Sequence, residues 1–328
     1  MKKIVSLLII SLLLMTPIFA QGVQEDTSKV KIGFSKIIQH PALDAVEQGV
    51  MDVLTEEGVD ASFDLQNANG DIATAASIAQ KFKSDKVNFA VGIATPTAQA
   101  LANVITEGTV IYSAVTDPVA AGLVDSFDVG YKNITGVSDM TPVEAQIQML
   151  KEIAGVTRLG HVYNSGEANA VLLAEMTEAA CDKLGMEFIP SAVTNTSEVK
   201  QATQALVGKV NGLYVSTDNT VVSAMPSLVD VANNAGVPVL TADPTSSEGL
   251  DVLIAWGFDY YKMGRATGYL IKDIIDGADP SEIGTVFMTK PSDIELWVNL
   301  DVAADLGITI PAEFIEGATV VIENGVKK

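Results

Sequence analysis

The sequence has few of the side chains that commonly serve as nucleophiles, bases or metal ligands. Among its 328 residues there are one cysteine and two histidines. A single cysteine excludes an internal disulfide, and no zinc-protease, redox dithiol, P-loop or nucleophile-elbow motif occurs. A catalytic carboxylate pair stays open, but 41 acidic residues make any one pair uninformative. We therefore expect a chain that binds rather than catalyses, without metal or cofactor.

Basic residues are also scarce. The chain has 20 Lys and Arg against 41 Asp and Glu, for a formal net charge of −21, and only Arg158 and Arg265 carry a guanidinium. Such a chain repels the phosphate backbone of nucleic acids. We expect no nucleic-acid partner, whereas a small ligand held in a cleft is compatible with this charge.

Long apolar runs are missing except at the amino terminus. Lys2 and Lys3 precede an apolar run over 4–15, and small and polar residues follow up to Ala20. This order is typical of a secretory signal peptide over 1–20, and the apolar run is too short to span a bilayer. It predicts an exported, periplasmic product cut near Ala20. Without disulfides, that product needs a large hydrophobic core, which about 300 residues can supply.

What the sequence does contain is a regular alternation of short apolar runs and segments of helical spacing. One example is the run 30–34, followed by apolar residues at helical spacing over 43–54. Alternation of this kind predicts βαβ units and mostly parallel sheets, hence an α/β fold. The lone Cys181 lies in such a helical segment and His161 in an apolar run, so both are expected in the core.

The alternation breaks at 134–139 and then starts again, which predicts two similar lobes. Later segments at 257–259 and 285–295 are expected to cross between the lobes, so each lobe is discontinuous. The predicted boundaries are 30–136 plus about 258–285 for lobe 1, and 139–256 plus about 286–328 for lobe 2.

Polar side chains follow the predicted strands at their carboxyl ends. Parallel α/β sheets bind ligands at this edge, although each such residue alone is more often a helix cap or a turn residue. The candidate ligand-binding residues are Ser35, Thr95, Thr97, Thr116, Asp117, Ser165, Glu167, Asn169, Thr217, Asp218, Asn219 and Asp243.

Several longer stretches carry a family resemblance. They are TPTAQALA at 95–102, YSAVTDPVAAGLV at 112–124, NITGVSD at 133–139, YNSGEANA at 163–170, LYVSTDNTV at 213–221 and GFDYYKMGR at 257–265. On these stretches the chain resembles the TrpX-like periplasmic substrate-binding proteins of ABC transporters, and the resemblance covers nearly all of the mature chain. The resemblance implies a type I periplasmic binding fold, with two Rossmann-like lobes joined by three crossings. It implies an aromatic amino acid as ligand (Trp, Tyr or Phe), an ABC permease as partner, and a monomer.

An α-amino acid in a closed cleft needs partners for both of its charges. Helix-start amides and hydroxyls around Thr95, Thr97 and Ser165 could meet its carboxylate. Asp218 and Asp117 are the candidates for its ammonium, and we favour Asp218 because Asp117 precedes a proline and could serve a turn. Two other functions remain open: a sensory receptor for a small solute and, less favoured, an exported enzyme of the same fold. A DNA-binding repressor of related fold is excluded by the signal peptide and by the lack of a basic DNA-reading segment at the amino terminus.

Overall fold

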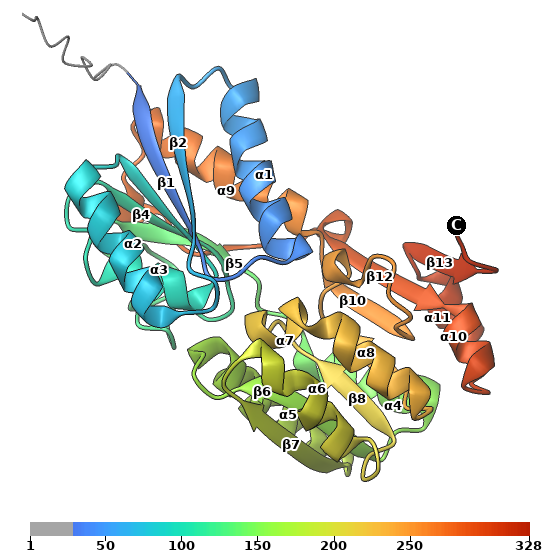
Figure 1. Ribbon diagram of the computed structural model, residues 1–328. Coiled ribbons are helices and arrows are strands. Elements are labelled where there is room, and N and C mark those ends of the chain that lie inside the picture. The colour runs from blue at the N-terminus through green and yellow to red at the C-terminus, as the bar shows by residue number, and fades with distance from the viewer. Residues whose placement is uncertain (1–28) are drawn as a thin grey trace, which may run out of the picture.

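The computed structural model describes residues 29–328, so the expected signal peptide lies outside the described residues. The chain forms two α/β lobes, each built on its own twisted sheet (Figure 1). Among the described residues, no helix combines the length and the apolar character needed to cross a membrane.

The first sheet has six strands in the order β11-β5-β4-β3-β1-β2, all paired in parallel. Its strands are β1 (Val30–Lys36), β2 (Ala61–Asn67), β3 (Phe89–Ile93), β4 (Thr109–Val115), β5 (Ile134–Ser138) and β11 (Val286–Phe287). The helices of this lobe are α1 (Pro41–Glu56), α2 (Ile72–Asp85), α3 (Thr95–Ala102) and α9 (Tyr260–Ile275), with the short 3-10 turn η2 (Pro280–Glu282).

The second sheet has eight strands in the order β14-β13-β12-β10-β9-β8-β6-β7. Its strands are β6 (Arg158–Asn164), β7 (Glu187–Val193), β8 (Gly212–Val215), β9 (Val239–Thr241), β10 (Ile254–Phe258), β12 (Ile294–Asn299), β13 (Val320–Glu323) and β14 (Val326–Lys327). The pairs β10–β12 and β13–β14 are antiparallel, and the other pairs are parallel. The helices of this lobe are α4 (Val143–Ala154), α5 (Ala168–Leu184), α6 (Thr196–Leu206), α7 (Asn219–Ser223), α8 (Met225–Asn234), α10 (Leu300–Asp305) and α11 (Ala312–Glu316), with the 3-10 turns η1 (Thr245–Ser247) and η3 (Pro291–Asp293).

The sheets define where the chain passes between the lobes. It leaves the first sheet after β5, returns from β10 to α9 at Asp259, and leaves again between β11 and β12. Two expected boundaries shift. Val286 and Phe287 pair with β5 in the first sheet, not the second, and Phe258 still belongs to β10 of the second sheet. A two-residue strand such as β11 carries too little pattern for its sequence to show which sheet edge it joins.

The hydrophobic core contains the two side chains expected there. Cys181 is buried as a free thiol, and burial raises its pKa to about 11. His161 is also fully buried, between the rings of Tyr163, Phe188 and Tyr214, and burial lowers its pKa to about 3. An imidazole held neutral among aromatic rings is a packing residue.

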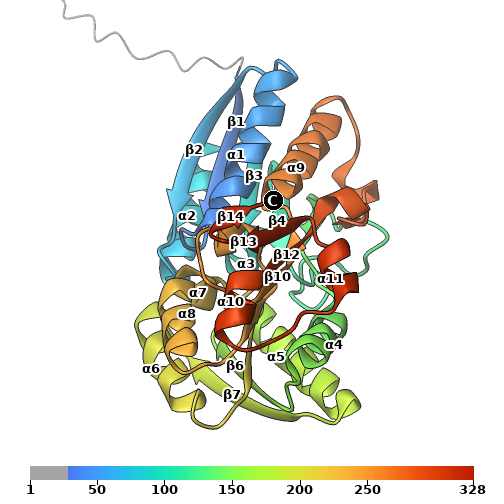
Figure 2. The same cartoon turned by 90° about the vertical axis from the view of Figure 1, so that its right-hand side faces the viewer.

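Helices α1 and α9 lie side by side in both views (Figure 1, Figure 2), although about 200 residues separate them along the chain. Their backbones touch at two glycines. A Cβ added at Gly264 would lie 2.2 Å from the carbonyl oxygen of Val46, and one at Gly49 would lie 2.4 Å from that of Tyr261. This contact fixes α9, which enters from the second lobe, to the first lobe.

Candidate functional site

The carboxyl ends of both sheets face each other, and a small void lies between them. Its volume is about 10 Å³, and it is lined by His40, Leu43, Asp139, Thr217, Asn219, Val222, Asp243 and Tyr260. These residues come from the start of α1, the first crossing, the loops after β8 and β9, α7 and the start of α9. A void of this size has room for about one water molecule, far less than an amino acid. The lobes are therefore closed against each other.

Direct hydrogen bonds hold the closed arrangement. The backbone N–H of Ala42 donates to Ser246 Oγ at 3.2 Å, and the same hydroxyl lies 3.4 Å from His40 Nδ1. On the hinge side, the backbone N–H of Tyr260 donates to Thr245 Oγ1 at 3.4 Å. The start of α1 therefore docks on the loop after β9 when the lobes close.

Four of the predicted residues each have a buried side-chain oxygen that lacks a hydrogen-bond partner. These atoms are Ser35 Oγ, Thr95 Oγ1, Asn169 Oδ1 and Thr217 Oγ1. Two belong to each lobe: Ser35 is the second-last residue of β1, and the other three follow β3, β6 and β8. Each unpaired buried polar group costs about 1–3 kcal/mol, so such groups are kept where a ligand or water completes them.

Other predicted residues have partners of their own. Asp117 Oδ1 accepts from the N–H groups of Val119 and Ala120, both at 2.9 Å, and so caps a turn. Thr97 Oγ1 donates back to Ile93 O at 2.7 Å within the start of α3. Ser165 is exposed, and its hydroxyl lies 3.5 Å from Val193 O.

The acidic residues of the second lobe form an internal network. Glu167 accepts from the side chains of Asn164, Thr220 and Asn219, the last at 2.6 Å. Asp218 caps α7: its two oxygens accept from the backbone N–H of Asn164 at 2.5 Å and of Val221 at 3.0 Å. Burial, and then the charge of Glu167, raise the pKa of Asp218. The network fixes the two loops that carry Asn169, Thr217 and Asn219.

Two further buried carboxylates reach the void. Asp139 accepts from Tyr260 Oη at 2.9 Å and from the predicted residue Thr116, through Oγ1, at 3.2 Å. Asp243 accepts from the backbone N–H of Ser246 at 2.8 Å. Burial raises the pKa of each to about 6.

The candidate ligand-binding residues predicted from the sequence include Asp243 but not Asp139, His40 or Tyr260. Asp139 has the same position as the predicted residues, because it directly follows a strand of the first sheet, β5. His40 directly precedes the proline that starts α1, and burial lowers its pKa from 6.5 to about 4. The strand-end pattern could have found Asp139, whereas only the packing of the lobes identifies the other two.

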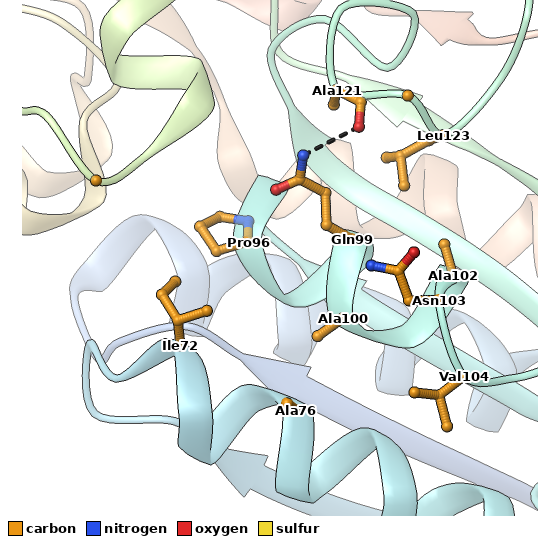
Figure 3. A pocket seen from close by; sticks show the side chains of 12 residues that line it. Ile72, Ala76, Pro96, Gln99, Ala100, Ala102, Asn103, Val104, Ala121 and Leu123 are labelled. Carbon is orange, nitrogen blue, oxygen red and sulfur yellow. Dashed lines mark hydrogen bonds between the residues drawn. The ribbon is translucent and has the colours of Figure 1, made fainter.

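A larger groove lies on the rim of the first lobe (Figure 3). It measures about 420 Å³, is lined mainly by small apolar residues of α2 and α3, and opens beside Gly166 of the second lobe. The amide of Gln99 is already bonded to Ala121 O at 3.0 Å. No charged side chain lines this groove, so we place the site for a charged solute at the interlobe void instead.

The geometry agrees with comparisons to known proteins. Residues 31–322 match the family model described as ABC transporter substrate binding protein. A tyrosine-binding protein of Clostridioides difficile (strain R20291) is 35% identical over 283 residues, which cover 84% of this chain and 81% of the relative. A crystal structure of a conserved domain protein from Vibrio cholerae is 37% identical with a TM-score of 0.86, covering 90% of this chain and all of that one.

Two other solved structures bear on the lobe arrangement. The L-Trp complex of an ABC domain from Streptococcus pneumonia is 31% identical with a TM-score of 0.85, covering 90% of this chain and 100% of that one. The ligand-free, open structure of a substrate binding protein with adhesive properties from Clostridium difficile is 34% identical, but its TM-score is 0.64, covering 86% and 96%. Because the identities are similar, we attribute the difference in TM-score to lobe arrangement, and this chain is arranged like the L-Trp complex. The fold is that of type I periplasmic binding proteins, and the chain belongs to the ABC transporter substrate binding protein family.

Proposed function

We propose that this substrate-binding protein holds an aromatic α-amino acid between its lobes and delivers it, without chemical change, to an ABC permease in the membrane. The observation that carries this proposal is the set of buried, unpartnered polar atoms at the carboxyl ends of strands in both lobes. The ligands named for two of its relatives, tyrosine and L-Trp, support the aromatic class.

Residues at the interlobe edge suit the different parts of such a ligand. Thr95 does not line the void itself, but it opens α3, whose first amides and unpartnered hydroxyl suit a carboxylate. His40, Leu43, Val222 and Tyr260 give the void an apolar and aromatic wall. Because the void holds about one water, the lobes must open to admit the ligand and reclose on it.

Calorimetry of the refolded protein tests the ligand class. Refolding removes any solute that was copurified. We expect a Kd near micromolar for L-Trp, L-Tyr or L-Phe, which needs about 8 kcal/mol of net binding free energy. L-Leu should bind at least tenfold more weakly, because a smaller side chain leaves part of the apolar wall uncovered. Absence of binding by all three aromatic amino acids, together with release of a different solute from the unfolded protein, would contradict the proposal.

We also propose that the protein is exported as a monomer after cleavage behind Ala20. Intact-mass measurement of the exported protein should give the mass of 21–328, with no lipid added because 1–20 contains no cysteine. A mass that includes Met1 or Lys2 would show that the segment is retained.

A further inference from the structure

Asp139 and Asp243 are two buried carboxylates that face one void. The two residues are 3% and 1% exposed, and Asp243 lies within the influence of the negative charge of Asp139. Burial raises the pKa of both carboxyls to about 6, and the negative charge of Asp139 adds to the rise at Asp243. The closed form therefore places two buried carboxylates beside one void.

No positive group among residues 29–328 lines that void to balance it. His40 faces it, but burial lowers the pKa of His40 to about 4, so the imidazole is neutral at pH 7. Lys36 is close enough to act on His40, but its ammonium already pairs with Asp44 and, at 3.4 Å, with Glu47. The remaining titratable neighbours are Tyr260, which donates to Asp139, and Tyr214 behind it.

Independent evidence for a missing ligand comes from uncharged groups in the same void. Thr217 Oγ1 and His40 Nε2 have no hydrogen-bond partner of normal geometry, although both side chains are more than nine-tenths buried. The Asn219 side chain lies close enough to His40 to influence its pKa. An ammonium group has three N–H donors, and Asp139, Asp243 and Thr217 offer three acceptors.

The positions of Asp139 and Asp243 would couple a bound cation to lobe closure. Asp139 lies in the first crossing and is held by Tyr260 from the second crossing, whereas Asp243 follows β9 in the second lobe. A cation between them would touch the hinge and the second lobe together. It would favour closure through contacts that the open form lacks.

We propose that Asp139 and Asp243 together bind the ammonium group of the ligand, so that a solute that carries this charge stabilises the closed form more than one that lacks it. The inference rests on the proposed function. It takes the role expected of Asp218 from the sequence and assigns it elsewhere, because Asp139 and Asp243 line the void and Asp218 does not.

The test compares L-tryptophan with indole-3-propionate, which keeps the ring and the carboxylate but lacks the amine. Calorimetry is run on the wild type, Asp139→Asn, Asp243→Asn and Asp218→Asn. Asp301→Asn is the matched control, since its carboxylate accepts from Asn324 and Gly325 at the surface. We expect the Asp139 and Asp243 variants to bind L-tryptophan at least tenfold more weakly, and indole-3-propionate as well as or better than the wild type. The control should bind both ligands as the wild type does.

The outcomes separate the inference from the proposed function. Equal losses for both ligands would mean that Asp139 and Asp243 act only structurally, and would overturn the inference. So would a loss selective for L-tryptophan in Asp218→Asn alone, which would restore Asp218 as the anchor. A wild type that binds no aromatic amino acid overturns the proposed function, and the inference with it. Unchanged melting temperatures in the Asn variants would exclude misfolding as the cause of a selective loss.

Discussion

Lowering the pH from 7.5 to 5 is expected to weaken aromatic amino-acid binding by a factor on the order of 10 to 30. The cause is His40, which contacts Ser246 of the second lobe only when the lobes are closed. In the open form its imidazole meets water and has an ordinary pKa of 6.5, whereas closure lowers this pKa to about 4. Below pH 6.5 the open form therefore gains a proton that the closed form rejects, and closure loses free energy until the pH approaches 4.

The carboxylates of the void do not reverse this sign. Asp139 and Asp243 have a raised pKa of about 6 only when they are buried without a cation. In the open form carboxyls titrate near pH 4, and a bound ammonium keeps them ionised in the closed form, so they contribute little above pH 5.

Kd measured by calorimetry across this range checks the expectation. His40→Gln should bind with nearly constant Kd between pH 7.5 and 5, because glutamine does not titrate. A wild-type Kd that stays constant over the same range would show that closure does not bury His40.

Gly264→Ala is expected to lower the free energy of unfolding by about 2–3 kcal/mol, near the upper end for overpacking of a tight interface. The new methyl group would stand 2.2 Å from Val46 O, a backbone atom that no side-chain rotation can move away. Helices α1 and α9 would have to separate, and α9 is the segment by which the chain returns to the first lobe.

Urea denaturation measures this loss. Gly208→Ala is the matched control, since its Cβ would meet nothing within 4 Å and its backbone is not left-handed. The control should keep wild-type stability or gain slightly, because alanine restricts the unfolded chain. Equal stability of both variants would contradict the close backbone contact between α1 and α9.

Much of the fold follows from local sequence pattern. The apolar residues of 260–275 recur at helical spacing, and α9 occupies that same range. Strands such as β3 and β4 are short apolar runs because parallel strands are covered on both faces. The rule that ligands meet the carboxyl ends of such strands also predicted Ser35, Thr95, Asn169 and Thr217, each of which has one buried side-chain oxygen without a hydrogen-bond partner.

The sequence by itself thus determined the α/β class, the repeated lobes and the edge at which polar side chains gather, because each depends on neighbours within one element. Tertiary structure decided which carboxylates line the void between the lobes and which are used inside one lobe. Asp218 is bonded to Asn164, 54 residues away, and Asp139 receives Tyr260 from 121 residues away. It also decided that His40 is buried and that β11 joins the first sheet. Contacts between such distant segments depend on how the lobes pack, and no local spacing encodes that packing.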